Sequence, residues 1–144
     1  MDEKLFDDLA QVLRQQMDCY ERALDLLREE KGLLIKGDLE ALGEQVKQKE
    51  TMGLEVKVLE EARLGLMRKI GALVELPERE LTCSKLAELA PPCCTPHYQA
   101  LLARFKQLIG QVATVNEQNG LLLESSSIGG AATVVQPGIL DFLR

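Results

Sequence analysis

The sequence predicts an all-α protein built on long helices, and three observations lead to that prediction. Apolar residues recur every three or four positions over most of the chain, which is the period of one helix face. Leu, Glu, Lys, Gln and Ala dominate the composition, with no Trp and only 3% aromatic residues. The prolines and one Gly-Asp pair fall where these periods break, so they divide the chain into separate helices.

The first helix is predicted from about Phe6 to Leu34. Its apolar stripe is broad enough to face more than one neighbouring helix. The seam consists of Phe6, Leu9, Leu13, Met17, Tyr20, Leu24, Leu27 and Leu34, widened by Leu5, Val12, Ala23, Leu26 and Leu33. Gly37 suits the left-handed residue that ends a helix, and Asp38 can accept the free amide hydrogens of the next one. A tight helical hairpin is therefore expected here.

The second helix is predicted from Asp38 to about Leu76, where Pro77 prevents continuation. Its predicted seam consists of Leu39, Leu42, Val46, Met52, Val56, Leu59, Leu66, Ile70 and Leu73. The helix also contains Gly43, Gly53, Gly65 and Gly71. Each glycine costs roughly 1 kcal/mol relative to Ala in a helix interior. We therefore expect this helix to depend on packing against its neighbours.

A short helix and a third long helix follow. Thr82 can cap a short helix over Cys83 to Leu89, and prolines at 91 and 92 then force a turn. Thr95-Pro96 places a cap and a first-turn proline at the start of the third long helix. Its stripe consists of Tyr98, Leu101, Leu102, Phe105, Leu108, Ile109, Val112, Val115, Asn119, Leu122, Leu123 and Ser126. Three long helices of this kind can form a bundle.

The end of the chain differs in composition from the rest. Residues 128–138 contain turn-forming residues and no helical period, so they are predicted to be a linker. The sequence thus divides into a helical domain, residues 1–127, and a flexible tail, residues 128–144. The tail ends in four large apolar residues, Ile139, Leu140, Phe142 and Leu143. Because solvent exposure would waste their burial, we expect them to meet a partner surface.

Charge and hydropathy exclude several classes of function. The formal net charge of -6 argues against nucleic-acid binding, which requires Lys and Arg concentrated on one face. The N-terminus is acidic where a signal peptide would be basic. No uninterrupted apolar run is long enough to span a bilayer. We therefore expect a cytoplasmic protein that does not insert into membranes.

Neither catalysis nor a cofactor is expected. His97 is the only histidine, and no glycine-rich phosphate-binding loop is present, so no catalytic residues are assigned. Cys83, Cys93, Cys94 and His97 together have the right donor chemistry for zinc. Adjacent cysteines rarely both reach one tetrahedral ion, however, and the chain has no Cys-x-x-Cys pair. The four thiols, including Cys19, are predicted to be reduced and free of metal.

Two segments resemble the FlgN family of flagellar export chaperones. The first comprises Leu24, Leu27, Glu30, Leu34, Gly37-Asp38, Leu42, Lys49-Glu50, Leu59 and Arg63, and is similar to the first hairpin of that family. The second, residues 115–123, contains an Asn-x-x-Asn followed by leucines and is similar to a second family signature. The resemblance covers most of residues 10–126.

The resemblance implies an antiparallel helical coiled coil that binds the C-terminal helical segments of hook-associated (hook-filament junction) proteins and keeps them soluble. It also implies delivery of these clients to the export gate. Relatives can carry a tail tyrosine that assists recognition by the gate, whereas this chain has no Tyr after Tyr98. Phe142 is then the only aromatic candidate in the tail.

Asn116 and Asn119 lie three residues apart, on neighbouring positions of one helix face that points toward the seam. One interpretation, which we favour, is that a buried Asn fixes the register of the helices. The other is that the pair hydrogen-bonds to the backbone of a client.

The predicted client-binding site is an apolar groove beside the third long helix. It consists of Val112, Val115, Asn119, Leu122 and Leu123, together with Ile139, Leu140, Phe142 and Leu143. Without a client, the same apolar surface would favour a homodimer. The alternative function is a structural coiled coil or helical adaptor with a permanent partner.

Overall fold

The computed structural model describes residues 3–91, 95–126 and 137–143, and within these ranges every regular element is helical. The elements are α1 (Glu3–Lys36), α2 (Leu39–Val74), the 3-10 helix η1 (Glu78–Glu80), α3 (Cys83–Leu89), α4 (Thr95–Ser126) and α5 (Pro137–Phe142). The all-α prediction is confirmed. No helix in these ranges combines the length and apolar character needed to cross a membrane.

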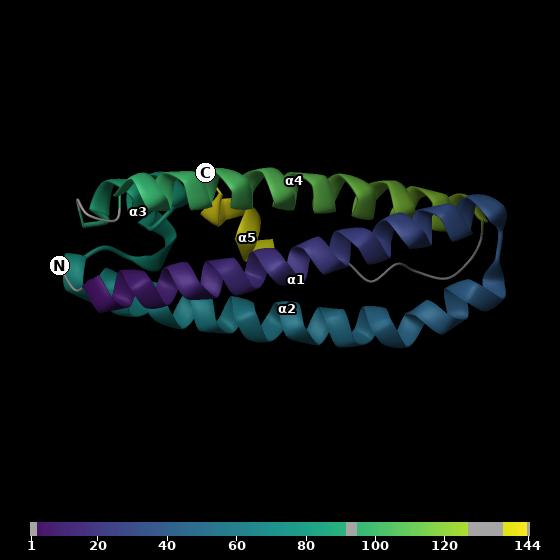
Figure 1. The fold of residues 1–144 in the computed structure, drawn as a ribbon, viewed down its shortest axis with the longest axis horizontal. Helices are drawn as coiled ribbons and strands as arrows, with labels where there is room; N and C mark the ends of the chain where they lie inside the picture. Colours follow the sequence, from purple (N-terminus) through teal and green to yellow (C-terminus); the bar gives the residue numbers. More distant parts are fainter. Residues whose placement is uncertain (1–2, 92–94, 127–136, 144) are drawn as a thin grey trace.

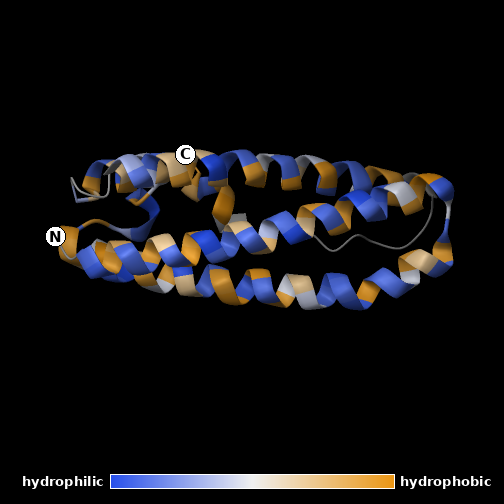
Figure 2. Ribbon diagram, in the orientation of Figure 1, coloured by the Kyte–Doolittle hydropathy of each residue, from blue (hydrophilic) through white to orange (hydrophobic). Residues whose placement is uncertain are grey.

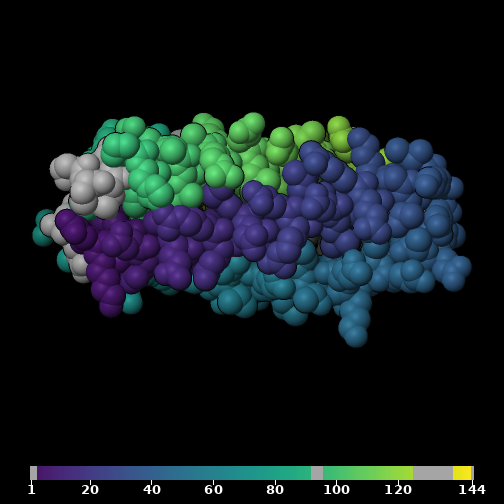
Figure 3. Space-filling view, viewed as in Figure 1, coloured from purple at the N-terminus to yellow at the C-terminus, as the bar shows by residue number. Residues whose placement is uncertain are grey.

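The three long helices lie side by side in an elongated rod, with α1 between the other two (Figure 1). Helix α2 runs antiparallel to α1, and α4 runs in the same direction as α1 (Figure 1). One long face of the rod is formed by all three helices (Figure 3). The central position of α1 follows from its broad apolar stripe, because α1 packs along both α2 and α4.

The hairpin between α1 and α2 forms as the sequence predicts. Gly37 has a left-handed φ of 72°, and the Asp38 carboxylate accepts a hydrogen bond from the Ala41 amide at 3.1 Å. Helix α2 ends at Val74, just before Pro77. A Cβ on Gly71 would lie 2.7 Å from the Leu76 carbonyl oxygen, so only glycine fits where the chain leaves this helix.

The predicted seam of α2 is partly wrong. Val56 and Ile70 are buried, whereas Leu39, Val46 and Leu73 are exposed. The residues that face the bundle are instead Gln45, Lys49, Met52, Val56, Glu60, Arg63, Met67, Ile70 and Val74, all of them buried or half-buried. These positions are spaced by three or four residues, and from Val56 onward the steps of four and three alternate as in a heptad seam. Four of them are polar or charged, so counting apolar residues alone missed these positions. Five residues of the predicted seam, Met52, Val56, Leu59, Leu66 and Ile70, do lie in the core or pack against it.

Helices α3 and α4 match their predictions. The Thr82 hydroxyl caps α3 by accepting a hydrogen bond from the Lys85 amide at 3.4 Å. Helix α4 has Pro96 in its first turn. The side chains of its stripe that are buried are Tyr98, Leu101, Leu102, Phe105, Leu108, Ile109, Val112, Asn119 and Leu123. Figure 2 shows that hydrophobic residues recur at intervals along the whole length of each long helix, with hydrophilic residues between them.

The last described segment, α5, adds a helix that the sequence did not predict. Most of the predicted linker, residues 128–138, lies outside the described residues. Ile139, Phe142 and Leu143 are buried in the main hydrophobic core, and Leu140 is 55% exposed. The surface that these apolar residues were expected to need is therefore provided, for three of the four, by this chain itself.

Candidate functional site

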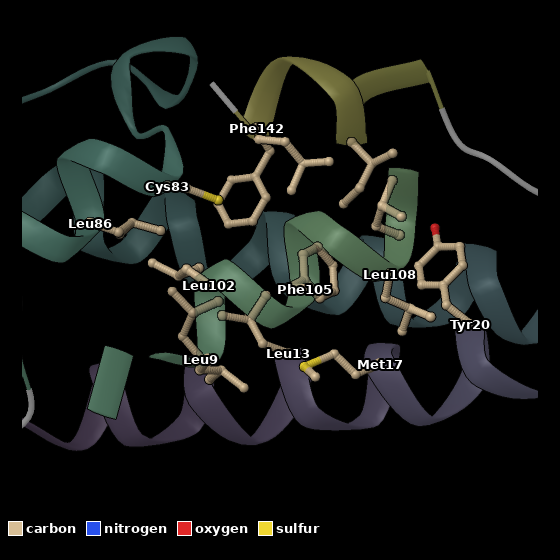
Figure 4. Packing of buried hydrophobic residues seen from close by; sticks show 14 of the residues in the cluster. Leu9, Leu13, Met17, Tyr20, Cys83, Leu86, Leu102, Phe105, Leu108 and Phe142 are labelled. Atoms are coloured by element: carbon tan, nitrogen blue, oxygen red, sulfur yellow. The ribbon is translucent and has the colours of Figure 1, made fainter. Parts of the chain in front are cut away.

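Helix α5 is seated on the bundle by aromatic contacts. The Phe142 ring lies edge-on to Phe105 of α4 with 6.2 Å between the ring centroids, and Phe105 in turn meets Tyr20 of α1 at 6.3 Å. Figure 4 shows these rings pointing into one continuous part of the core. Edge-to-face pairs of this kind add to the free energy of simple apolar burial. The aromatic series therefore connects α1, α4 and α5.

Beneath α5 lies a buried charged residue, Arg63 of α2, which is only 1% exposed. The Phe142 ring covers its guanidinium group, with 4.2 Å from the central carbon to the ring centroid. Arg63 Nε donates to Glu60 Oε1, and Nη1 lies 2.8 Å from Met67 Sδ. Gln16 of α1 donates to the same Glu60 oxygen at 3.4 Å. We refer to Gln16, Glu60 and Arg63 as the buried polar layer.

Several polar atoms in and beside this layer are buried without a hydrogen-bond partner. They are Gln16 Oε1, Tyr20 Oη and Glu60 Oε2. Burial also raises the pKa of Tyr20 well above its usual value, so its hydroxyl stays protonated. A buried polar atom without a partner costs about 1–3 kcal/mol. The polar layer therefore retains hydrogen-bonding capacity that the free chain does not use.

The surface covered by α5, here called the α5 groove, is formed by Arg63 of α2 and Phe105 of α4, with Tyr20 of α1 packed behind Phe105. An open pocket of about 610 Å³ borders it, between α2, η1 and α5. The lining of this pocket includes Arg63, Met67 and Phe142. The α5 groove is therefore closed by α5 on one side and open to solvent beside it.

A second polar network joins the three long helices nearer the hairpin. The Asn119 side-chain amide of α4 donates to the Leu27 carbonyl at 2.8 Å and to Glu30 Oε1 at 2.9 Å. Lys49 of α2 pairs with Glu30 Oε2 at 2.8 Å. This geometry favours the interpretation that Asn119 fixes helix register, since its amide group binds α1 directly. Asn119 Oδ1 and both side-chain polar atoms of Gln45 are buried without a partner.

The nine residues of the predicted client-binding site differ in burial and in their distance from α5. On α4, Val112, Asn119 and Leu123 are buried, whereas Val115 and Leu122 are half-buried. On α5, only Leu140 is exposed. Phe142 contacts Phe105, which precedes Leu123 by five helical turns, or roughly 27 Å. Val112 lies in the same core cluster as Ile139, Phe142 and Leu143, with Val115 packed against it, whereas Leu123 lies farther along α4.

Sequence reasoning missed the buried polar layer. The signal was present in the four-three spacing of Val56, Glu60, Arg63, Met67 and Ile70. An Arg and a Glu at consecutive seam positions predict a buried ion pair, because both side chains must face the neighbouring helix.

The predicted cysteine and histidine cluster is only partly described. His97 is exposed and contacts the Arg14 guanidinium group of α1, whereas Cys83 is buried in the core. Cys93 and Cys94 lie outside the described residues. Among the residues with described positions, no three His, Cys, Asp or Glu side chains are grouped so as to hold a metal ion.

The thiols of Cys19 and Cys83 are expected to react slowly. Burial raises the pKa of each to about 11, so the reactive thiolate is scarce at pH 8. Raising the pH from 9 toward 11 should favour the unfolded state, whose thiols lose their protons first. In a variant with Cys93 and Cys94 replaced by Ser, we expect a disulfide reagent to label Cys19 and Cys83 at least about 100-fold more slowly in the folded protein than in urea. Equal labelling rates in buffer and in urea would contradict this prediction.

The comparisons with known proteins identify the family. No curated protein and no solved structure matches the chain. The model of one protein family, described as FlgN protein, matches residues 1–128, which include α1 to α4. The match contains both segments that carry the resemblance, and Glu30, Lys49 and Asn119 from those segments meet in one network. The chain therefore belongs to the FlgN family of flagellar export chaperones.

Proposed function

We propose that this chain is a cytoplasmic type III export chaperone that binds the C-terminal helical segment of a hook-filament junction protein and keeps it soluble before export. The observation that supports this most directly is the α5 groove, which already holds a short amphipathic helix. A groove that accepts one such helix has the shape and apolar character to accept another. The function is one of binding, and no step of it requires a catalytic group.

The proposed client-binding surface has two parts. The distal part is the α4 stripe of Val112, Val115, Asn119, Leu122 and Leu123. The other part is the region of the bundle at α5, where Ile139, Leu140, Phe142 and Leu143 lie. In the free chain a client can reach Val115, Leu122 and Leu140 directly, because these side chains are half-buried or exposed. Contact with the export gate through Phe142 would require α5 to leave the bundle, because Phe142 is buried.

The rival function, a permanent helical scaffold or homodimer, is favoured by one observation. Leu54 and Val58 of α2 lie one turn apart and are 66% and 63% exposed. Exposed apolar residues on one helix face suit a lasting contact with a second copy or another subunit. Light scattering during gel filtration separates the two functions, since a scaffold would remain oligomeric when a junction protein is added.

The direct test is to mix the purified chain with a purified hook-filament junction protein. We expect a stable complex and suppression of the junction protein's self-association, measured by light scattering. Leu122→Asp should weaken binding by at least about tenfold, because a charge would be buried against the client.

The matched control for this test is Val58→Asp, which places the same charge on the exposed face of α2. Its affinity should equal that of the unaltered chain, with circular dichroism verifying that both variants remain helical. If only Val58→Asp weakened binding, the client-binding site would lie on α2 and not on α4.

A further inference from the structure

Helix α5 has the properties of a segment that can detach from the helical bundle. It contains six residues, and ten further residues, 127–136, connect it in sequence to the end of α4. A helix of one or two turns is unstable in water, so α5 depends on its docking contacts. Those contacts come from Ile139, Phe142 and Leu143, at positions i, i+3 and i+4 of one helix face.

The place where α5 docks is suited to an aromatic side chain. The guanidinium group of Arg63 is buried, and the Phe142 ring covers one of its faces. Without a ring there, this face of a buried cation would be left uncovered. An incoming helix must therefore supply a flat apolar or aromatic group at the same point.

In the free chain, α5 does not use all the contacts that the α5 groove offers, so another helix could bind there more tightly. Gln16 Oε1, Tyr20 Oη and Glu60 Oε2 are buried and unpaired while α5 is docked. The open pocket of about 610 Å³ between α2, η1 and α5 provides space for side chains larger than those of α5. A partner helix with larger side chains on this side could cover more of the surface than α5 does.

We propose that α5 is an internal competitor, which occupies the α5 groove in the free chain and is displaced when the client helix docks there. The preferred client helix presents large apolar residues at i, i+3 and i+4, with an aromatic residue at i+3. This is the pattern of Ile139, Phe142 and Leu143. The inference rests on the proposed function and deepens it, because it specifies the chemistry of the client and how access to the groove is controlled.

Two variants of the full chain should change client affinity in opposite directions. Phe142→Ala removes the ring that seats α5, so a purified hook-filament junction protein should bind at least about threefold more tightly. Gly138→Ala should strengthen α5, because Ala favours the helix and a Cβ at this position meets nothing within 4 Å. Binding should then weaken by about twofold to fivefold. Leu73→Ala, at an exposed site on α2, should leave the affinity unchanged.

Hydrogen exchange followed by mass spectrometry gives the direct readout. Adding the junction protein to the unaltered chain should increase exchange in residues 137–143 and maintain protection around Tyr20, Arg63 and Phe105. Weaker binding in Phe142→Ala, or unchanged protection of α5 in the complex, would overturn the inference and make α5 part of the client-binding surface. Should the junction protein bind neither the unaltered chain nor any variant, the proposed function fails, and this inference fails with it.

Discussion

Replacing Arg63 with Ala is expected to lower the free energy of unfolding by about 3–5 kcal/mol, because it leaves a buried carboxylate without its counter-charge. Glu60 is 6% exposed, and its remaining protein partner is the Gln16 amide at 3.4 Å. The substitution also removes the cation beneath the Phe142 ring. Unfolding in urea, followed by circular dichroism, measures the loss.

The control for Arg63 is Arg68→Ala on the same helix. Arg68 is largely exposed and lies 3.5 Å from Glu78, so its removal should cost no more than about 1 kcal/mol. Replacing Glu60 and Arg63 together with Leu should recover much of the stability, since neither charge then remains buried alone. Similar losses for Arg63→Ala and Arg68→Ala would show that the buried pair is not important for stability.

The buried pair also explains why the face of α2 was difficult to predict. In α1 and α4 the seam positions are mostly apolar, so the spacing of apolar residues identified the correct face. In α2 the seam includes Gln45, Lys49, Glu60 and Arg63, and apolar residues such as Leu54 and Val58 lie outside it. A prediction that ranks positions by hydrophobicity alone therefore misses these four polar positions, although it correctly includes Val56 and Ile70. The four-three spacing remains visible when polar residues are allowed at seam positions.

The local signals were reliable where one or two residues determine the backbone. Gly37, Asp38 and Thr82 act as the sequence predicts, because a left-handed φ or a capping hydrogen bond depends only on near neighbours. Helix α5 is the opposite case. Its six residues are too short to show a helical period, and its helix depends on contacts with Arg63 and Phe105, which are distant in sequence.

The candidate site was only partly predictable for the same reason. The sequence predicts that Ile139, Phe142 and Leu143 meet a partner surface, whereas the structure buries them against helices of the same chain. That surface forms only when Tyr20 and Phe105 come together from helices far apart in the chain. Long-range packing of this kind leaves no local pattern in the sequence.

Replacing Phe105 with Ala is expected to cost about 3–5 kcal/mol, as the loss of a fully buried aromatic ring does. Phe105 lies in α4 and contacts rings on both α1 and α5, so its loss opens a cavity in the main core. Urea unfolding with circular dichroism measures this cost as well.

The same substitution at Phe142 should cost less, although Phe142 is also buried. Burying Ile139, Phe142 and Leu143 is worth roughly 1.5–3 kcal/mol each, and ordering each residue from 137 to 143 costs about 1–2 kcal/mol. These terms nearly cancel, so α5 can detach at low cost, and no substitution within it can destabilise the bundle by more than that cost. Phe142→Ala and deletion of residues 137–144 should therefore lower stability by the same small amount. If either change costs as much as Phe105→Ala, α5 is an integral part of the core and cannot act as an exchangeable occupant of its groove.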